Sequence, residues 1–285
     1  MKIFISIITI IISYFSIKKA SKFLITTKNK MLPEYDSSNF VDITTIIPDI
    51  LLDIRYYSTY NFVGERINGY KESIALMTKE AANALKKASD YLKEKGYLIK
   101  IYDSYRPQRS VDHFVNWTKN NDTKMKKYFY PDLDKKDIIP KDYVAPKSGH
   151  SKGSTIDLTL FNMNEGKDID MGGTFDFFGE ISHPDYINIT NQQKKNREFL
   201  IDSMRKFGFE VISTEWWHFY LKNQPFNNTF FNFDVSKDSI KEKENSWKIF
   251  IYFCVFICGF FFGLGIFCFF CKHKTNNESL SEKII

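Results

Sequence analysis

The sequence predicts a single α+β domain, built on a mixed or antiparallel sheet flanked by helices and followed by a C-terminal transmembrane helix. Three observations lead to this fold class. The 285-residue chain carries strongly apolar segments at both ends. Its 43% hydrophobic and 26% charged residues are typical of a globular protein. Between the ends, helical and strand patterns follow one another without a regular strand–helix repeat, which favours an α+β arrangement.

Periodicity places the elements of the domain. The stretch 78–96 has apolar residues at spacings of three and four and stops at Gly96, which predicts a helix. The runs YLIKIY at 97–102 and TIDLTLF at 155–161 predict strands. The polar stretch 118–147, with its three prolines, is expected to be a loop. Further helices are expected at 110–117 and 191–207, and further strands at 209–213 and 216–221.

The two apolar ends predict a membrane protein. Residues 1–20 are expected to be a signal peptide or signal anchor, and cleavage is favoured because the apolar run is shorter than the roughly 20 residues of a membrane span. Residues 249–271 carry no charge and predict a single transmembrane helix. The expected topology is an extracytoplasmic domain at 41–235, a linker at 21–40, a juxtamembrane linker at 236–248 and a cytoplasmic tail at 272–285.

Several surface features suggest partners or exclude them. The formal net charge of +6 comes from interspersed basic and acidic residues, so no nucleic-acid partner is expected. Gly259 and Gly263 have the spacing that lets membrane helices approach, which permits a homodimer. The glycosylation motif Asn-x-Ser/Thr occurs at Asn116, Asn121, Asn188 and Asn227. All four cysteines lie within 254–271, so neither a disulfide nor a Cys-based metal site is expected in the domain.

One polar cluster combines a histidine with a carboxylate. His150 lies in a glycine-rich loop that begins at Ser148, and Asp157 follows seven residues later at the start of a predicted strand. Gly149 and Gly153 let the backbone turn so that both side chains can approach one ion. Imidazole nitrogen and carboxylate oxygen are ligands that zinc accepts. Taken alone, such a pair is more often an ordinary hydrogen-bonded pair than a pair of metal ligands.

Two further clusters carry chemistry of the same kind. Glu215 and His218 lie three residues apart around two tryptophans, which suits a base and a metal ligand or, alternatively, satisfied polar neighbours of a core. In a regular strand these side chains would point to opposite faces, so a bulge or a strand end must bring them together. Arg106 follows the predicted strand at 97–102 and suits either an oxyanion-binding cation or a structural ion pair with Asp103.

In this order and spacing, the three clusters resemble the D-alanyl-D-alanine dipeptidases of the vancomycin-resistance type, the VanX family. The resemblance runs from about residue 41 to residue 235. It rests on YDSYRPQRSVDHF, YVAPKSGHSKGSTIDLTLF, DMGGTFDFFGEISH, NREFLIDSMRKFGFE and STEWWHFYL. It implies a zinc peptidase that hydrolyses the dipeptide D-alanyl-D-alanine to two D-alanines.

The resemblance also implies roles for individual residues. His150, Asp157 and His218 would hold one zinc ion per chain and leave a fourth coordination position open. Glu215 would serve as general base and acid, and Arg106 would stabilise the transition state.

Substrate recognition is implied for three more residues. Asp176 would bind the free amino group of the dipeptide, and Tyr56 and Ser148 would contact the substrate. Two features depart from the family: Thr155 stands where alanine is usual, and the predicted membrane anchor is atypical. Two alternatives stay open, namely a related D,D-carboxypeptidase or endopeptidase acting on peptidoglycan stem peptides, and a non-catalytic, membrane-displayed zinc-binding module.

Overall fold

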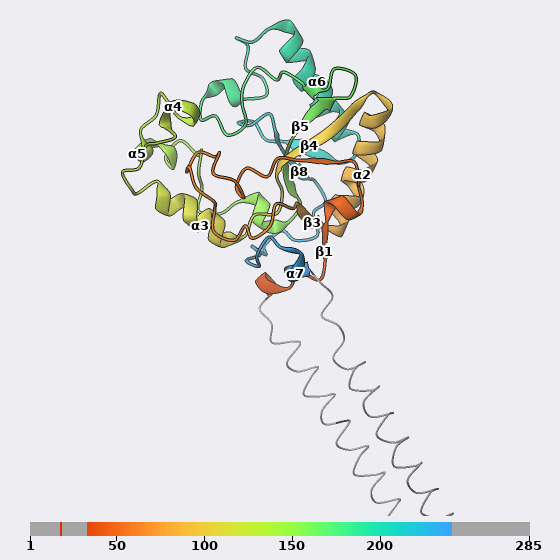
Figure 1. Ribbon diagram of the computed structural model, residues 1–285, viewed down its shortest axis with the longest axis horizontal. Helices are drawn as coiled ribbons and strands as arrows, with labels where there is room; N and C mark the ends of the chain where they lie inside the picture. Colours follow the sequence, from red (N-terminus) through yellow and green to blue (C-terminus); the bar gives the residue numbers. More distant parts are fainter. Residues whose placement is uncertain (1–17, 19–32, 241–285) are drawn as a thin grey trace, which may run out of the picture. The chain divides into compact units, whose positions relative to one another are not determined.

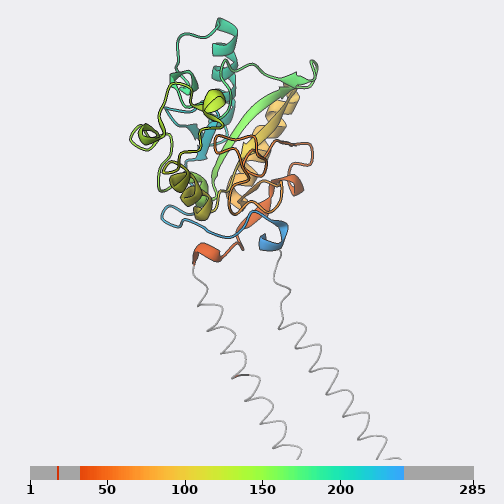
Figure 2. The same ribbon diagram turned by 60° about the vertical axis from the view of Figure 1, so that its left-hand side comes forward.

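The computed structural model of the protein describes residue 18 and residues 33–240, and the latter form a mixed α/β domain (Figures 1 and 2). Its main sheet has the strand order β2–β4–β5–β8–β7, and β6 pairs with the far end of β5. Only β2 and β4 run parallel; the other pairs are antiparallel. The strands are β2 (Leu51–Leu52), β4 (Tyr97–Asp103), β5 (Thr155–Asn162), β6 (Lys167–Asp168), β7 (Phe209–Val211) and β8 (His218–Leu221). A second small sheet pairs β1 (Phe40–Asp42) with β3 (Leu76–Thr78).

Helices cover the main sheet. The two long helices, α2 and α6, contact each other and pack on the sheet through β4 and β7. Both views place α3 on the side of the sheet away from α2 (Figures 1 and 2). The helices are α2 (Lys79–Glu94), α3 (Gln108–Trp117), α4 (Lys126–Phe129), α5 (Lys135–Ile138), α6 (Asn191–Arg205) and α7 (Lys237–Ile240). Four short 3-10 turns lie at Pro33–Tyr35, Ile43–Thr45, Gly149–Lys152 and Glu180–Ser182.

Local sequence signals account for the ends of the long helices. The Thr78 side chain accepts a hydrogen bond from the backbone of Ala81 and so caps α2. Thr190 and Gln193 form a reciprocal capping box at the start of α6. Gly96, at φ 88°, ends the first helix in a left-handed conformation that favours glycine. The helices predicted at 78–96, 110–117 and 191–207 are therefore confirmed, with small shifts of their ends.

Strand register brings polar side chains to one edge of the sheet. Asp103 at the end of β4 pairs with Asp157 near the start of β5, and Asp157 pairs in turn with His218 at the start of β8. A register shift between Ile101 and Asp103 marks an irregularity in β4 just before this row. Three strands that are far apart in sequence thus place these three side chains side by side.

Two expectations about local structure are corrected. The strand expected at 216–221 begins at His218, because Trp216 and Trp217 belong to a turn in which His218 N–H donates to the carbonyl of Glu215. The polar stretch 118–147, expected to be a loop, contains the short helices α4 and α5. Each has only four residues, too short for helical periodicity to register.

The predicted fold class and localisation need a correction that concerns the membrane. Among the described residues, no helix is long and apolar enough to cross a membrane. The longest, α2, has 16 residues, or about 24 Å at 1.5 Å per residue, against a hydrocarbon core of about 30 Å. The structure supports the mixed α/β domain, and the described residues give no support to a single-pass membrane protein.

Some sequence predictions fall on residues outside those described. These are the signal segment at 1–20, apart from Lys18, most of the linker at 21–40, the transmembrane helix at 249–271 with Gly259 and Gly263, and the tail at 272–285. The four Asn-x-Ser/Thr asparagines lie within the domain and are all exposed.

Candidate metallopeptidase site

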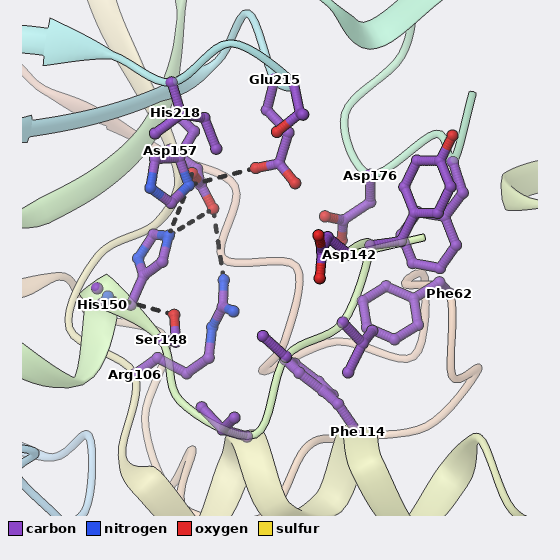
Figure 3. A pocket seen from close by; sticks show the side chains of 18 of the residues that line it. Phe62, Arg106, Phe114, Asp142, Ser148, His150, Asp157, Asp176, Glu215 and His218 are labelled. Carbon is purple, nitrogen blue, oxygen red and sulfur yellow. Dashed lines mark hydrogen bonds and ion pairs between the residues drawn. The ribbon is translucent and has the colours of Figure 1, made fainter. Parts of the chain in front are cut away.

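Three side chains, one from a 3-10 turn and two from neighbouring strands, converge at the sheet edge. His150 comes from the 3-10 turn Gly149–Lys152, Asp157 from β5 and His218 from the start of β8. One ligand atom from each lies within 4.8 Å of the others, and the side chains of His150 and Asp157 are almost fully buried. Figure 3 shows the two imidazoles and the carboxylate facing one another. The structure therefore brings together the three residues expected to hold a metal.

The His150 ring is oriented by a bond on its outer side. Its Nδ1 lies 2.6 Å from the carbonyl oxygen of Ser104, so Nδ1 carries the hydrogen and donates it. Nε2 is then left with a lone pair, and it points toward Asp157 and His218. This arrangement, in which a backbone carbonyl fixes the tautomer, is common for metal-ligating histidines. Gly153, at φ 81°, permits the close turn because a Cβ there would overlap the Phe40 ring.

The separations of the donor atoms fit a tetrahedral zinc ion. His150 Nε2 lies 3.2 Å from Asp157 Oδ2 and 3.3 Å from His218 Nδ1, and His218 Nδ1 lies 3.2 Å from Asp157 Oδ1. Ligands about 2.0–2.1 Å from a tetrahedral ion stand about 3.3 Å apart. Asp157 Oδ1 is buried and has no partner in hydrogen-bonding geometry despite the nearby imidazole. A buried carboxylate oxygen without a hydrogen-bond partner, among donor atoms this close, indicates a site suited to a cation.

Electrostatics favour a positive charge at the same point. Burial lowers the pKa of His218, but its contacts with Asp157 and Glu215 outweigh burial and raise the pKa to about 9. Burial raises the pKa of Asp157, but the two neighbouring histidines outweigh it and bring the pKa below its usual range. Without a metal, a proton on His218 supplies the cation that the carboxylates attract.

Glu215 lies beside the cluster without belonging to its buried interior. Its Oε2 is 3.2 Å from His218 Nδ1, and its side chain stays 25% exposed. Residues three apart in a regular strand would point to opposite faces. Here the turn before β8 brings Glu215 and His218 together at the strand end. A carboxylate in this place can reach a water molecule next to the cluster.

Arg106 forms the structural ion pair with Asp103 and is also a cation that lines the cavity. Its Nε donates to Asp103 Oδ2 at 2.9 Å, which is the structural ion pair. Its Nη2 reaches to 3.5 Å from Asp157 Oδ2, and the guanidinium lies 4.8 Å from the centre of the Tyr56 ring. Burial lowers the pKa of Arg106, but Tyr56 and Asp103 outweigh it and raise the pKa well above its usual value. The cation is thus permanently charged and lines the cavity.

Asp103 is a buried carboxylate that the sequence showed only as a partner of Arg106. It accepts a hydrogen bond of 2.5 Å from the Tyr70 hydroxyl and lies 3.6 Å from His150 Nδ1. Burial is the main reason that its pKa is raised. Its contacts reach both the metal-site histidine and the arginine, and its place directly before Ser-Tyr-Arg-Pro was the available signal.

Asp176 faces the cluster from across the cavity (Figure 3). It is 7% exposed, and the Tyr56 hydroxyl donates to its two oxygens at 2.9 and 3.2 Å. Burial, followed by the charge of Asp157, raises the pKa of Asp176 well above its usual value. Its backbone φ of 62° is in the left-handed region, which is strained for a residue other than glycine.

One cavity of about 210 Å³ contains all eight residues singled out from the sequence. Ser148 lines it, and its hydroxyl also accepts a hydrogen bond from the backbone of His150 at 3.3 Å. The remaining wall was not foreseen. It includes Phe62, Phe114, Asp142 and Phe178, which the sequence analysis did not mark as site residues. Asp142 and Asp176 both line the cavity and are labelled in Figure 3.

Thr155 packs beside Gly149, the residue directly before the metal-site histidine. Its Oγ1 is buried without a hydrogen-bond partner and lies 3.0 Å from where a Cβ on Gly149 would be. The threonine hydroxyl therefore occupies the space that a side chain at position 149 would need. Glycine at 149 and threonine at 155 fit as a pair.

Histidine and carboxylate donors at zinc-like separations, with a carboxylate and a cation beside them in one cavity, define a zinc metallopeptidase. Comparison with known families agrees. The model of the peptidase M15 family, described as D-Ala-D-Ala dipeptidase, matches residues 36–236. The chain belongs to this dipeptidase family.

Curated relatives cover the same region. The chain is 37% identical over 197 residues to a D-alanyl-D-alanine dipeptidase of Enterococcus faecium, covering 69% of this chain and 98% of the relative. A D-alanyl-D-alanine dipeptidase of Enterococcus faecalis is 36% identical, with 70% and 99% covered. One from Streptomyces coelicolor is 33% identical, with 70% and 100% covered. The family predicted from the sequence is confirmed.

Proposed function

We propose that this chain hydrolyses the free dipeptide D-alanyl-D-alanine to two D-alanines, using one zinc ion held by His150, Asp157 and His218. The observation that carries the proposal is the position of Asp176. A buried carboxylate stands across a small cavity from the metal-site cluster, where it can bind the amino end of a short peptide. The named activity of the relatives agrees with this substrate.

Proton transfer is assigned to Glu215. Zinc, when bound by the three donors, supplies a Lewis acid that polarises the peptide carbonyl and activates water. Glu215 takes the proton from the attacking water and later passes it to the nitrogen of the leaving D-alanine. Its partial exposure leaves its carboxylate accessible to both. The peptide C–N bond breaks. One D-alanine keeps the water oxygen in its carboxyl group, and the other receives the proton on its nitrogen.

Charge on the carbonyl oxygen is assigned to Arg106. Its guanidinium is fixed through Nε by Asp103 and lies against the Tyr56 ring. The guanidinium lines the cavity and can donate to the oxygen as negative charge develops there. Preorganisation by Asp103 means that little reorganisation is needed when the charge appears.

Recognition of the amino end is assigned to Asp176 and Tyr56. Burial and the charge of Asp157 raise the pKa of Asp176, and the cation of Arg106 offsets this only in part. The ammonium group of a dipeptide would supply a cation in direct contact, so binding favours a substrate with a free amino end. Ser148 lines the same cavity and is assigned to a further substrate contact.

Cavity size supports a dipeptide in preference to a longer chain. The volume of about 210 Å³ is below the roughly 300–1,000 Å³ of pockets for drug-sized ligands. A longer peptide would have to extend its chain past Asp176, which is buried and held by Tyr56.

Release of D-alanine from three substrates tests the proposal. The full-length protein is given D-Ala-D-Ala, N-acetyl-D-Ala-D-Ala and a pentapeptide that ends in D-Ala-D-Ala. We expect kcat/KM for the free dipeptide to exceed the other two by at least about 10²-fold, because acetylation leaves a buried carboxylate unpaired. Faster cleavage of the pentapeptide would instead favour a carboxypeptidase that acts on stem peptides.

A further inference from the structure

Arg197 is a buried cation outside the catalytic cluster. It lies on α6, is only 1% exposed, and follows the same helix face as Leu200, Ile201 and Met204. A face of this kind normally carries only apolar residues. Within the described residues, no carboxylate forms an ion pair with this guanidinium. Such a burial is costly unless every donor is satisfied.

The guanidinium is satisfied by the backbone of one loop. Its Nε donates to the carbonyl of Met171 at 2.6 Å, its Nη2 to Ile181 at 2.8 Å and its Nη1 to His183 at 2.6 Å. Residues 171–183 form the loop that carries Asp176, and apart from one short 3-10 turn the loop has no regular structure. Arg197 therefore fastens both ends of this loop to α6.

The same side chain also contacts the segment that carries Glu215 and His218. The Trp216 ring lies 5.9 Å from the guanidinium carbon, and the backbone N–H of Trp216 donates to the carbonyl of Ser182 at 2.8 Å. Trp216 directly follows Glu215. The cation thus lies where the loop that carries Asp176 meets the segment that carries Glu215 and His218.

We propose that Arg197 is a positioning residue, which sets the place of Asp176 relative to the metal-site cluster. The left-handed φ of Asp176 needs a loop that is held firmly, because strain of this kind relaxes where the surroundings are loose. A lysine cannot replace the arginine, since one ammonium group cannot span three carbonyls that a planar fork reaches. This inference rests on the role proposed for Asp176.

The first test is the full-length variant Arg197→Lys, with Arg205→Lys as a matched control. Arg205 is on the same helix, but half-exposed at the surface. For Arg197→Lys we expect KM for D-Ala-D-Ala to rise at least about tenfold, the effect of one charge-assisted hydrogen bond, while the zinc content is unchanged. In an Asp176→Asn background the same substitution should have little further effect. An unchanged KM, or an equal loss in both backgrounds, would overturn the proposal.

The second test does not depend on catalysis. Amide hydrogen exchange should be faster in residues 171–183 of Arg197→Lys than in Arg205→Lys, with little change elsewhere. In the unmodified protein, the Nε–H of Arg197 should exchange far more slowly than that of Arg205. Equal rates in either comparison would refute the positioning role. If exchange behaves as expected but the protein releases no D-alanine, the proposed function fails and the positioning role stands.

Discussion

Glu215 is the residue whose removal should separate metal binding from catalysis. The carboxylate lies 3.2 Å from His218, but it is not one of the three converging donors. Glu215→Gln should therefore lower kcat by about 10²–10⁴-fold, the usual contribution of a general base, while the protein keeps its zinc. Steady-state kinetics and metal analysis check both parts.

Glu210→Gln is the control for this substitution. Glu210 is on β7 and pairs with Arg205 and Lys222 away from the cavity, so its variant should keep full activity. Substantial turnover by metal-loaded Glu215→Gln would show that another group moves the proton.

The raised pKa of His218 makes the metal-free protein sensitive to pH. A histidine whose pKa rises on folding, from 6.5 to about 9, adds stability that is complete below pH 6.5 and lost as the pH rises through 9. The melting temperature of the metal-free protein should therefore fall between pH 6.5 and 9.5. Zinc replaces the proton, so uptake of zinc at pH 7.5 should release about one proton from His218.

Calorimetry in two buffers of different ionisation enthalpy counts the released proton. For the stability part, His218→Gln should remove the decline in melting temperature, whereas His113→Gln should retain it. His113 pairs with Glu65 at the surface, away from the cavity, and serves as the control. No proton release, or the same decline in His218→Gln, would contradict this account of the site.

Most site residues could be identified from the sequence because they lie in short motifs. His150 and Asp157 share one motif, and Glu215 and His218 share another. Their spacing could not choose between metal ligands and ordinary hydrogen bonds, and the resemblance to a family made that choice. Arg197 and Asp142 were out of reach because they act on, or lie beside, segments that are distant in the chain.

At the scale of elements, the turn before β5 carries a packing pair. Gly149→Ala would place a Cβ 3.0 Å from Thr155 Oγ1, which should cost about 1–3 kcal/mol of stability by overpacking and weaken zinc binding through His150. Thr155→Ala alone removes a buried hydroxyl that has no partner and should be close to neutral. The double variant should recover most of the loss.

Denaturant unfolding of the four proteins, with and without zinc, measures the coupling between these positions. An interaction energy of about 0.5–3 kcal/mol is expected for residues in contact. Strictly additive effects would mean that the two residues do not share the space as the structure indicates.

The long elements were predictable and the short ones were not. α2 and α6 have clear periodicity and capping residues, and β4 and β5 are apolar runs bounded by turns. β1, β3 and β6 have two or three residues each, so their pairing depends on tertiary contacts. β8 begins only at His218 because Trp216 and Trp217 form a turn, although tryptophans are typical of strands.

At the scale of the whole molecule, the site exists only when the sheet is assembled. Asp103, Asp157 and His218 meet through the register of three strands, and Asp176 arrives on a loop fastened to α6. The sequence indicated which residues would meet but not which residues would form the rest of the cavity wall. The membrane topology predicted from the apolar ends has no support in residues 33–240.

The most direct test of the central claim is a zinc titration of metal-free, full-length protein, followed by release of D-alanine from D-Ala-D-Ala. The account predicts that activity rises in proportion to added zinc and stops at one equivalent per chain. His218→Ala should gain no activity over the same range. Release of D-alanine without any metal, or undiminished activity in zinc-treated His218→Ala, would contradict the assignment of the site.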